Sequence, residues 1–408
     1  MKDISIKQGN FTDNLSLFMF CVFLAFAPFS KAVVEVCFAS LLSLWLINNL
    51  TAKRKLKDWL PETGLNLPLF AFFLFCVFSI FISISHWESL KGGYGKWFEP
   101  FMYYFFTVII IKTRKIFKLA LWVITISFIF VLANAAWQFR TGTGFLSREV
   151  LENGEFICGQ FRSLNEFGVF LILTGPIVTL FLLRSKINKA ILLLFSVITA
   201  AILYLSFSAE SWFAILLSIP ACFLIFSKTS GASKILKISL AVFFVFLSFL
   251  FVPHESRSRI LKLYDQQLET PGGRPALWRL SLEEIKRDPV FGKGISTTSQ
   301  SVMRKHYTSK ILIHNMHPHN YYLLILLETG IVGFSIFFWL VFRLFKIVKA
   351  LPRDEMGFGF MLSAISFFLV NFVDTMREKR IQIIFWVIVG LMVAYSRLSL
   401  KPEAAKTK

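Results

Sequence analysis

The 408-residue sequence lacks the short motifs by which many enzymes bind nucleotides or metals. It contains no Gly-rich P-loop, no GxGxxG, no CxxC, no HExxH and no Asp-x-Asp pair. These absences argue against a nucleotide-dependent reaction and against a metal-bound nucleotide sugar as substrate. No internal repeat is visible, whereas a transporter built from two similar halves would be expected to show weak internal symmetry.

Cysteine and acidic residues are scarce. Of the five cysteines only Cys158 lies outside the apolar runs, so we expect no disulfide framework. There are 24 acidic residues against 44 Lys and Arg, a formal net charge of +20. Within the apolar runs the acidic residues are Glu35, Glu210 and Glu328. Because an uncompensated charge in a membrane is costly, we expect Glu328 to be structural and paired with an arginine from another helix.

Hydrophobic residues are abundant, at 56% of the chain with 49 Phe. Apolar runs of about 18 or more residues recur from end to end, which is typical of transmembrane helices. We predict an all-α polytopic membrane protein of about twelve transmembrane helices. The predicted spans lie near residues 15–30, 33–50, 66–85, 98–111, 118–138, 166–183, 190–206, 210–227, 235–253, 319–342, 356–373 and 381–397.

The basic residues orient these spans. With both termini on one side, 24 Lys and Arg lie in the tails and short loops of that side and nine in the opposite short loops. Because positive charge accumulates inside, both termini are predicted to be cytoplasmic. The predicted organisation is transmembrane helices 1–9 in residues 1–253, an outer loop in 254–318, helices 10–12 in 319–397 and a cytoplasmic tail in 398–408.

The long outer loop is expected to be partly helical and to bind an anion. Residues 276–287 are amphipathic, with Pro275 suited to the first turn and Pro289 following the end. The loop holds eleven Lys and Arg against six acidic residues, which suits a phosphate or pyrophosphate lipid. Most of these charges are expected only to be solvated. Arg274, within Gly-Gly-Arg-Pro, instead resembles an anchored phosphate-binding fork.

Three of the six histidines are His314, His317 and His319. A zinc site can use three imidazoles, but a His-Pro-His with no helical His pair or Cys nearby is weak metal geometry, and we predict no metal. For His314 and His317 we expect a structural role, as histidines at a helix end in the membrane interface whose hydrogen bonds are satisfied. His319, where the long loop re-enters the membrane, is predicted to be a catalytic base, since a histidine side chain ordinarily exchanges its proton near neutral pH. Asn320 is expected to orient it or to bind a sugar hydroxyl.

Two glycines follow His319 in the next apolar run. If the run is helical from His319, Gly330 lies roughly 20° and Gly333 roughly 40° from the direction of the histidine. The sequence therefore predicts one helix face that carries both the base and close helix packing.

These motifs resemble those of a known family. The spacing from His319-Asn320 over nine residues to Gly330, then two residues to Gly333, resembles the signature of the bacterial lipopolysaccharide O-antigen ligases, within the O-antigen ligase and polymerase superfamily. Gly273-Arg274 through Trp278 and Asp288 to Gly294 also looks like that family's loop. The family usually carries an arginine in a Ser-Arg motif where this chain has Ser206 to Trp212 around Glu210. Candidates to replace that cation are Arg162, Arg377, Lys379 and Arg380.

The resemblance implies a glycosyltransferase of GT-C-like architecture in the bacterial inner membrane. It implies transfer of a glycan from undecaprenyl pyrophosphate to a lipid A-core acceptor at the periplasmic face, with His319 as base and Arg274 against the pyrophosphate. Asn320, Arg162, Arg279, Arg377 and Arg380 would bind substrate. No metal, cofactor, nucleotide or nucleic acid is implied, and the only other partners are membrane lipids. A polymerase extending the glycan on its lipid carrier is the alternative, and a transporter or flippase is the third possibility.

Overall fold

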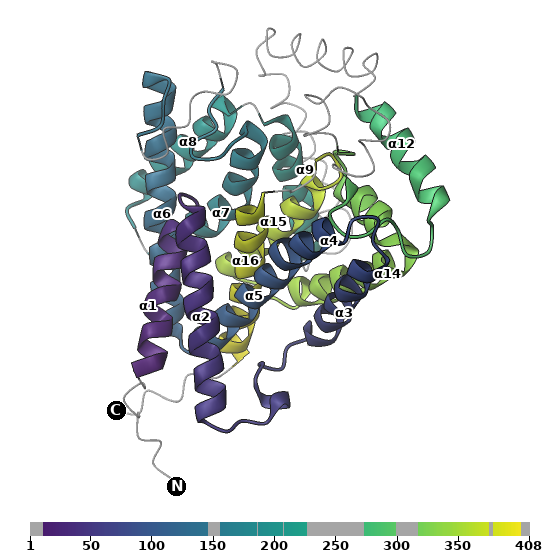
Figure 1. Cartoon of the computed structure of the whole chain (residues 1–408). Coiled ribbons are helices and arrows are strands. Elements are labelled where there is room, and N and C mark those ends of the chain that lie inside the picture. Colours follow the sequence, from purple (N-terminus) through teal and green to yellow (C-terminus); the bar gives the residue numbers. More distant parts are fainter. Residues whose placement is uncertain are drawn as a thin grey trace. The chain divides into compact units, whose positions relative to one another are not determined.

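The computed structural model describes residues 11–145, 156–185, 187–206, 208–226, 273–298, 317–374 and 378–400 (Figure 1). Helices dominate the described residues, which confirms the predicted all-α class. The helices are α1 (Phe11–Phe26), α2 (Lys31–Thr51), η1 (Leu56–Asp58), α3 (Asn66–Ile82), α4 (His86–Gly92), η2 (Gly93–Phe98), α5 (Glu99–Ile110), α6 (Arg114–Thr141), α7 (Leu164–Arg184), α8 (Lys189–Leu205), α9 (Ala209–Phe226), α12 (Arg274–Arg287), α14 (Tyr321–Lys349), α15 (Glu355–Val370) and α16 (Lys379–Leu400).

Six of these helices are long and apolar enough to cross a membrane: α2, α6, α7, α9, α14 and α16. Four shorter helices, α1, α3, α8 and α15, are apolar as well. The protein is therefore a polytopic membrane protein. The predicted ninth span, residues 235–253, lies outside the described residues.

The predicted fourth span, 98–111, corresponds to α5, and the sequence did not predict the helical residues that precede it. Helical residues follow one another without a break from His86 to Ile110, through the π-helical η2. Hydropathy missed the first part because it carries Lys91 and Lys96. The Lys91 ammonium lies over the Trp87 ring at 4.7 Å from its centroid, and Lys96 Nζ donates to Ser296 Oγ at 2.7 Å.

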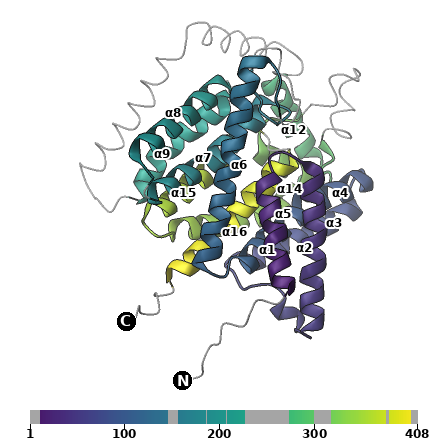
Figure 2. The ribbon, with the colours of Figure 1, turned by 90° about the vertical axis from the view of Figure 1, so that its left-hand side faces the viewer.

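The chain divides into two compact units, and the first comprises Met1–Thr63, Glu99–Phe207 and Arg380–Lys408. In this unit α1 and α2 pack side by side, and α6 packs on α1 and on α7 (Figure 2). Tyr103 of α5 is fully buried at their centre. Its ring stacks on Phe23 of α1 with centroids 4.1 Å apart, and its hydroxyl donates to the Val34 carbonyl of α2 at 2.7 Å. One side chain thus joins three helices.

The second unit comprises Gly64–Phe98 and Ser208–Lys379. Its closest helix pair is α9 and α15, where the hydroxyl oxygens of Ser218 and Ser366 lie 2.6 Å apart, and α3 packs against α14 (Figure 1). A Cβ added at Gly333 of α14 would lie 2.4 Å from Cε1 of Phe75 in α3. Gly333 therefore lies where α14 comes close to α3.

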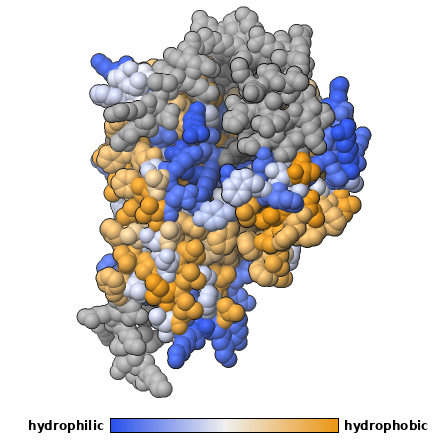
Figure 3. All heavy atoms as spheres, viewed as in Figure 1, coloured by the Kyte–Doolittle hydropathy of each residue, from blue (hydrophilic) through white to orange (hydrophobic). Residues whose placement is uncertain are grey.

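Large apolar side chains remain exposed along the outer faces of the helices. In Figure 3 they gather over α1 and α2, where Phe18, Val36 and Ile47 are exposed, and hydrophilic residues cover α12. A soluble monomer rarely exposes so extended an apolar surface, whereas a membrane protein exposes such a surface to lipid.

Candidate functional site

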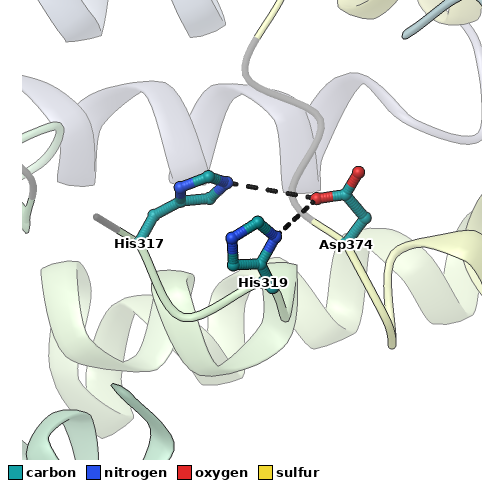
Figure 4. Close-up of side chains that lie close together, drawn as sticks. All are labelled: His317, His319 and Asp374. Atoms are coloured by element: carbon teal, nitrogen blue, oxygen red, sulfur yellow. Dashed lines mark hydrogen bonds and ion pairs between the residues drawn. The ribbon is translucent and has the colours of Figure 1, made fainter. Parts of the chain in front are cut away.

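Two histidines and an aspartate lie together at the start of α14 (Figure 4). His319 Nδ1 lies 3.2 Å from Asp374 Oδ1, and His317 Nε2 lies 4.0 Å from the same oxygen. The two imidazole rings are 4.1 Å apart between centroids and inclined by 32°. Asp374 is buried, with 9% of its side chain exposed, whereas the His319 side chain is 30% exposed. The cluster therefore has a charged, buried side and an accessible side.

The backbone of the second unit brings these residues together. Asn320 caps α14, because its Oδ1 accepts a hydrogen bond from the Leu323 N–H at 2.9 Å. The Tyr321 N–H donates to the Asn371 carbonyl at 2.8 Å, just past the end of α15. Asp374 follows in the same turn, with its N–H bonded to the Val370 carbonyl at 2.9 Å. The start of α14 thus lies beside the end of α15, and this places Asp374 against His319.

His319 adopts a backbone conformation that side chains rarely take, with φ of +46°. Histidine is among the residues that tolerate this region, at a cost of about 1–3 kcal/mol. Such strain is concentrated at functional sites. In this conformation Nδ1 contacts Asp374, and among the described residues Nε2 has no hydrogen-bond partner.

The amphipathic helix predicted at 276–287 is present as α12, with Leu277, Ser281 and Glu284 buried as expected for its inner face. Trp278 Nε1 donates a hydrogen bond to the carbonyl of Pro318, between the two histidines. Arg274 lies one helical turn before Trp278, and residues four apart share a helix face. The face of α12 that bears Arg274 therefore contacts the His317–His319 segment.

Arg274 forms an ion pair with Glu210 at the start of α9. The arginine side chain is 28% exposed, and its Nε atom is buried without a hydrogen-bond partner among the described residues. Part of the guanidinium fork is thus left for another acceptor. Among the described residues Arg274 is the cation that pairs with Glu210, and replacement of the missing Ser-Arg arginine by Arg162, Arg377, Lys379 or Arg380 stays a prediction.

Gly330 is not on a continuous helix face, so the predicted alignment of His319 with Gly330 is wrong. His319 precedes α14, and Gly330 interrupts it with φ of 59° and ψ of −169°. The interruption frees backbone groups that pair with the turn after α12. Ile331 N–H donates to the Pro289 carbonyl at 2.8 Å, and Gly294 N–H donates to the Glu328 carbonyl at 2.9 Å.

The expected partner of Glu328 is also wrong. Its Oε1 accepts a hydrogen bond from the hydroxyl of Thr298 at 2.8 Å, and the described residues place no arginine on it. This hydrogen bond provides a donor for one oxygen of the buried carboxylate, and it ties residues after α12 to α14.

We expect Gly330→Ala to unfold the protein at a clearly lower temperature. The added Cβ would lie 2.4 Å from the backbone of Val290, in a φ,ψ region open almost only to glycine. Gly142→Ala is the control, because Gly142 also has positive φ, +80°, but no atom lies within 4 Å of its Cβ position. Thermal unfolding of the purified proteins in detergent measures both. Equal midpoints for the two variants would contradict the backbone contact.

Buried charges hold the turn after α12. Lys293 Nζ lies 3.1 Å from Glu284 Oε2 and also contacts Asp288, while Arg287 contacts Glu284 from outside. Burial by itself would lower the pKa of Lys293, but hydrogen bonds to Asp288 and Glu284 outweigh it, and the pKa is raised. Lys293 is therefore a charged structural residue rather than a proton acceptor at neutral pH.

Part of the chain is similar in sequence to known proteins. Residues 194–338 match the sequence profile of the family described as O-Antigen ligase. The chain carries an O-antigen ligase domain. Two "Putative polysaccharide ligase" proteins, from Rickettsia typhi and Rickettsia felis, are each 26% identical over 133 residues. That segment covers 31% of this chain and 32% of each relative, so the chain matches about a third of the length of these relatives.

The O-antigen ligase domain contains some of the predicted site residues and not others. Glu210, Arg274 and His319 lie within 194–338. Asn320 and Arg279 do as well. Asn320 is the helix cap, and Arg279 is exposed on α12.

The other predicted arginines lie outside the O-antigen ligase domain. In the first unit, the backbone N–H of Arg162 donates to Glu166 Oε2 at 3.3 Å. Arg380 is buried in the same unit; its Nη1 donates to the Pro28 carbonyl at 2.7 Å, and its guanidinium lies 5.0 Å from the Phe161 ring centroid. Arg377 lies outside the described residues, as does His314. Substrate binding by these arginines stays a prediction.

Sequence reasoning missed Asp374 and underestimated His317. Asp374 comes directly after an apolar run, where a carboxylate is easily taken for an ordinary loop charge. Its proximity to His319 depends on α14 and α15 meeting at their ends. The oxygen and nitrogen atoms of His317, His319 and Asp374 lie within 4.8 Å of one another, so this trio could hold a divalent metal ion.

Proposed function

We propose that the protein is an O-antigen ligase that transfers a glycan from undecaprenyl pyrophosphate to a hydroxyl of the lipid A-core oligosaccharide. The observation that supports this most directly is the contact between His319 Nδ1 and the buried Asp374, at 3.2 Å, within reach of a helix that carries Arg274. A carboxylate on one ring nitrogen fixes the tautomer and leaves the other nitrogen as a proton acceptor.

In this reaction the acceptor hydroxyl oxygen forms a bond to the anomeric carbon while the bond from that carbon to the pyrophosphate oxygen breaks. His319 Nε2 takes the proton of the hydroxyl. Asp374 stabilises the imidazolium that results, as a buried carboxylate beside a histidine does. The electron pair leaves with the pyrophosphate, and attack opposite the leaving group predicts inversion at the anomeric carbon.

Arg274 would stabilise the charge that grows on the departing pyrophosphate. Its fork is held from one side by Glu210 and retains a buried Nε without a partner among the described residues. A preorganised cation of this kind costs no reorganisation during reaction. Arg279, exposed on the same helix, and Asn320, Arg162, Arg377 and Arg380 remain proposed contacts to the glycan or the phosphates.

The proposed topology has twelve transmembrane helices in a GT-C-like arrangement in the bacterial inner membrane. The excess of Lys and Arg in one set of loops supports cytoplasmic termini and a periplasmic site. Both substrates would then reach the site from the outer leaflet, the donor through its lipid.

Deletion of the gene, followed by gel analysis of the envelope glycolipids, tests the function. We expect loss of the long-chain ladder with accumulation of carrier-linked polymer. Core carrying a single repeat would instead indicate a polymerase, which extends the glycan on its carrier. Unchanged glycolipids would overturn both and leave a transport role.

Asp374→Asn is expected to lower kcat for transfer by about tenfold or more with little change in the KM for donor. An amide keeps the size but no longer stabilises the imidazolium or enforces its tautomer. Initial rates with purified enzyme measure this. A wild-type kcat would show that Asp374 does not act through His319.

Excess chelator is expected to leave transfer by the purified enzyme unchanged, without any nucleotide. A base and fixed cations need no metal, whereas a zinc ion held by His317, His319 and Asp374 would be stripped. A pH profile would not separate the two, because protonation inactivates both a free base and metal ligands. Loss of activity in chelator, restored by one divalent metal, would make the three residues ligands.

A further inference from the structure

The first unit contains a cavity of about 870 Å³ that the proposed transfer reaction does not use. It lies where helices end: at the start of α1, the end of α2, the end of α5 and the start of α6. Its volume is in the range of about 300–1,000 Å³ that is typical of small-molecule sites. The loop after α2 forms one wall, through Arg54, Asp58, Trp59 and Pro61.

Hydrogen bonds hold this wall in place. Trp45 Nε1 donates to the Trp59 carbonyl at 3.1 Å, and Trp59 Nε1 donates to the Arg54 carbonyl at 3.0 Å. The two indoles meet edge to face, with centroids 5.4 Å apart. At the end of the loop the Tyr104 hydroxyl donates to Thr63 Oγ1 at 2.8 Å. The cavity is thus preformed rather than a gap under a loose loop.

The lining is amphipathic. Leu17, Leu41 and Phe106 lie on the helices, and tryptophans at a helix end are typical of the boundary between lipid and water. A ligand that fits both parts has an apolar portion among the helices and a polar portion at the loop. A membrane lipid has this shape.

The charges of the lining are balanced. Asp13 and Lys112 lie 3.5 Å apart, and Arg54 and Asp58 add one positive and one negative group. Among the described residues the Arg54 guanidinium and the Asp58 carboxylate have no ion-pair or hydrogen-bond partner. A ligand that satisfies both carries an anionic and a cationic group, and the guanidinium fork is suited to a phosphate.

We propose that this cavity binds the headgroup of an aminophospholipid, with its phosphate on Arg54 and its primary ammonium on Asp58. The glycerol and the first parts of the acyl chains lie along Leu17, Leu41 and Phe106. The excess of Lys and Arg places this loop on the cytoplasmic side, so the lipid belongs to the inner leaflet. The site is independent of the proposed transfer chemistry.

Native mass spectrometry of the full-length, delipidated protein in detergent tests the proposal. Phosphatidylethanolamine is expected to bind at least about fivefold more tightly than phosphatidylglycerol, which lacks the cation, and than phosphatidylcholine, whose quaternary ammonium donates no hydrogen bond. Equal binding of the three lipids would overturn it. Soluble glycerophosphoethanolamine, added at the same concentration, is expected not to displace the lipid. Displacement would show that the ligand is a free phosphoester and would overturn the lipid assignment.

Two variants locate the site. Arg54→Gln and Asp58→Asn are each expected to abolish the preference for phosphatidylethanolamine. Lys57→Gln is the matched control, because Lys57 lies in the same loop but does not line the cavity, and it should retain the preference. Arg54 and Asp58 are exposed, so their substitutions are expected to leave folding intact. Wild-type preference in both variants, or its loss in Lys57→Gln, would contradict the site.

Discussion

Replacing His319 with alanine is expected to lower kcat for glycan transfer by about 10²–10⁴-fold, the range that general acid–base catalysis contributes. The ring that contacts Asp374 at 3.2 Å is the proposed proton acceptor, and no neighbouring group of the same type has the same access, since His317 is less exposed. The measurement is the initial rate of transfer from the lipid-linked donor by purified enzyme in vesicles. Membrane level and melting temperature are measured for the same samples, so that a loss of activity is assigned to the missing imidazole only in folded protein.

His317→Ala is the control for this variant. Its Nε2 lies 4.0 Å from Asp374, beyond hydrogen-bond distance, so we expect a loss of less than about tenfold. If both variants lose activity equally and chelator also inactivates the wild type, the two histidines act as ligands. If His319→Ala, well expressed, transfers glycan at a near-normal rate, His319 is not the base.

The sequence was sufficient to predict most of the helices but not the arrangement of side chains around His319. Apolar runs predicted most spans, because each helix that crosses the membrane needs about 20 mostly apolar residues of its own. The predicted helical wheel failed at Gly330, since a glycine with φ of 59° ends the helical register. Local pattern does not reveal such a break, because the groups that stabilise it, at Pro289 and Val290, lie far away in the chain.

Asp374 and the partner of Arg274 were beyond sequence reasoning for a related reason. Both are pairs between separate helices: Asp374 lies 55 residues from His319, and Glu210 lies 64 residues from Arg274. A phosphate-binding role for Arg274 was expected from Gly-Gly-Arg-Pro. Its ion pair with Glu210 was not expected, because the sequence showed Glu210 only within the segment that lacks the Ser-Arg arginine.

Arg274→Lys is expected to lower kcat/KM by about 10–100-fold, because a hydrogen bond to a charged group contributes about 1.5–3 kcal/mol. Lysine keeps the positive charge but offers no planar fork, so it cannot hold Glu210 on one nitrogen while a second nitrogen binds the pyrophosphate oxygens. The assay is the same transfer reaction over a range of donor concentrations. Lys286→Arg, an exchange of one cation for another on the exposed face of α12, is the matched control and should change kcat/KM by less than about threefold, as a solvated surface charge does.

Glu210→Gln separates the two proposed roles of Arg274, the ion pair with Glu210 and the binding of pyrophosphate. If Glu210 only holds Arg274 in place, the glutamine, which keeps an acceptor oxygen, should retain activity far above that of Arg274→Lys. If Arg274 serves only to form the ion pair, Glu210→Gln and Arg274→Lys should lower the melting temperature to a similar extent. The loss of activity in each variant should then match its loss of stability. Full activity in Arg274→Lys would mean that charge alone suffices. The pyrophosphate would then be bound by its charge alone, and bidentate hydrogen bonding by Arg274 would be excluded.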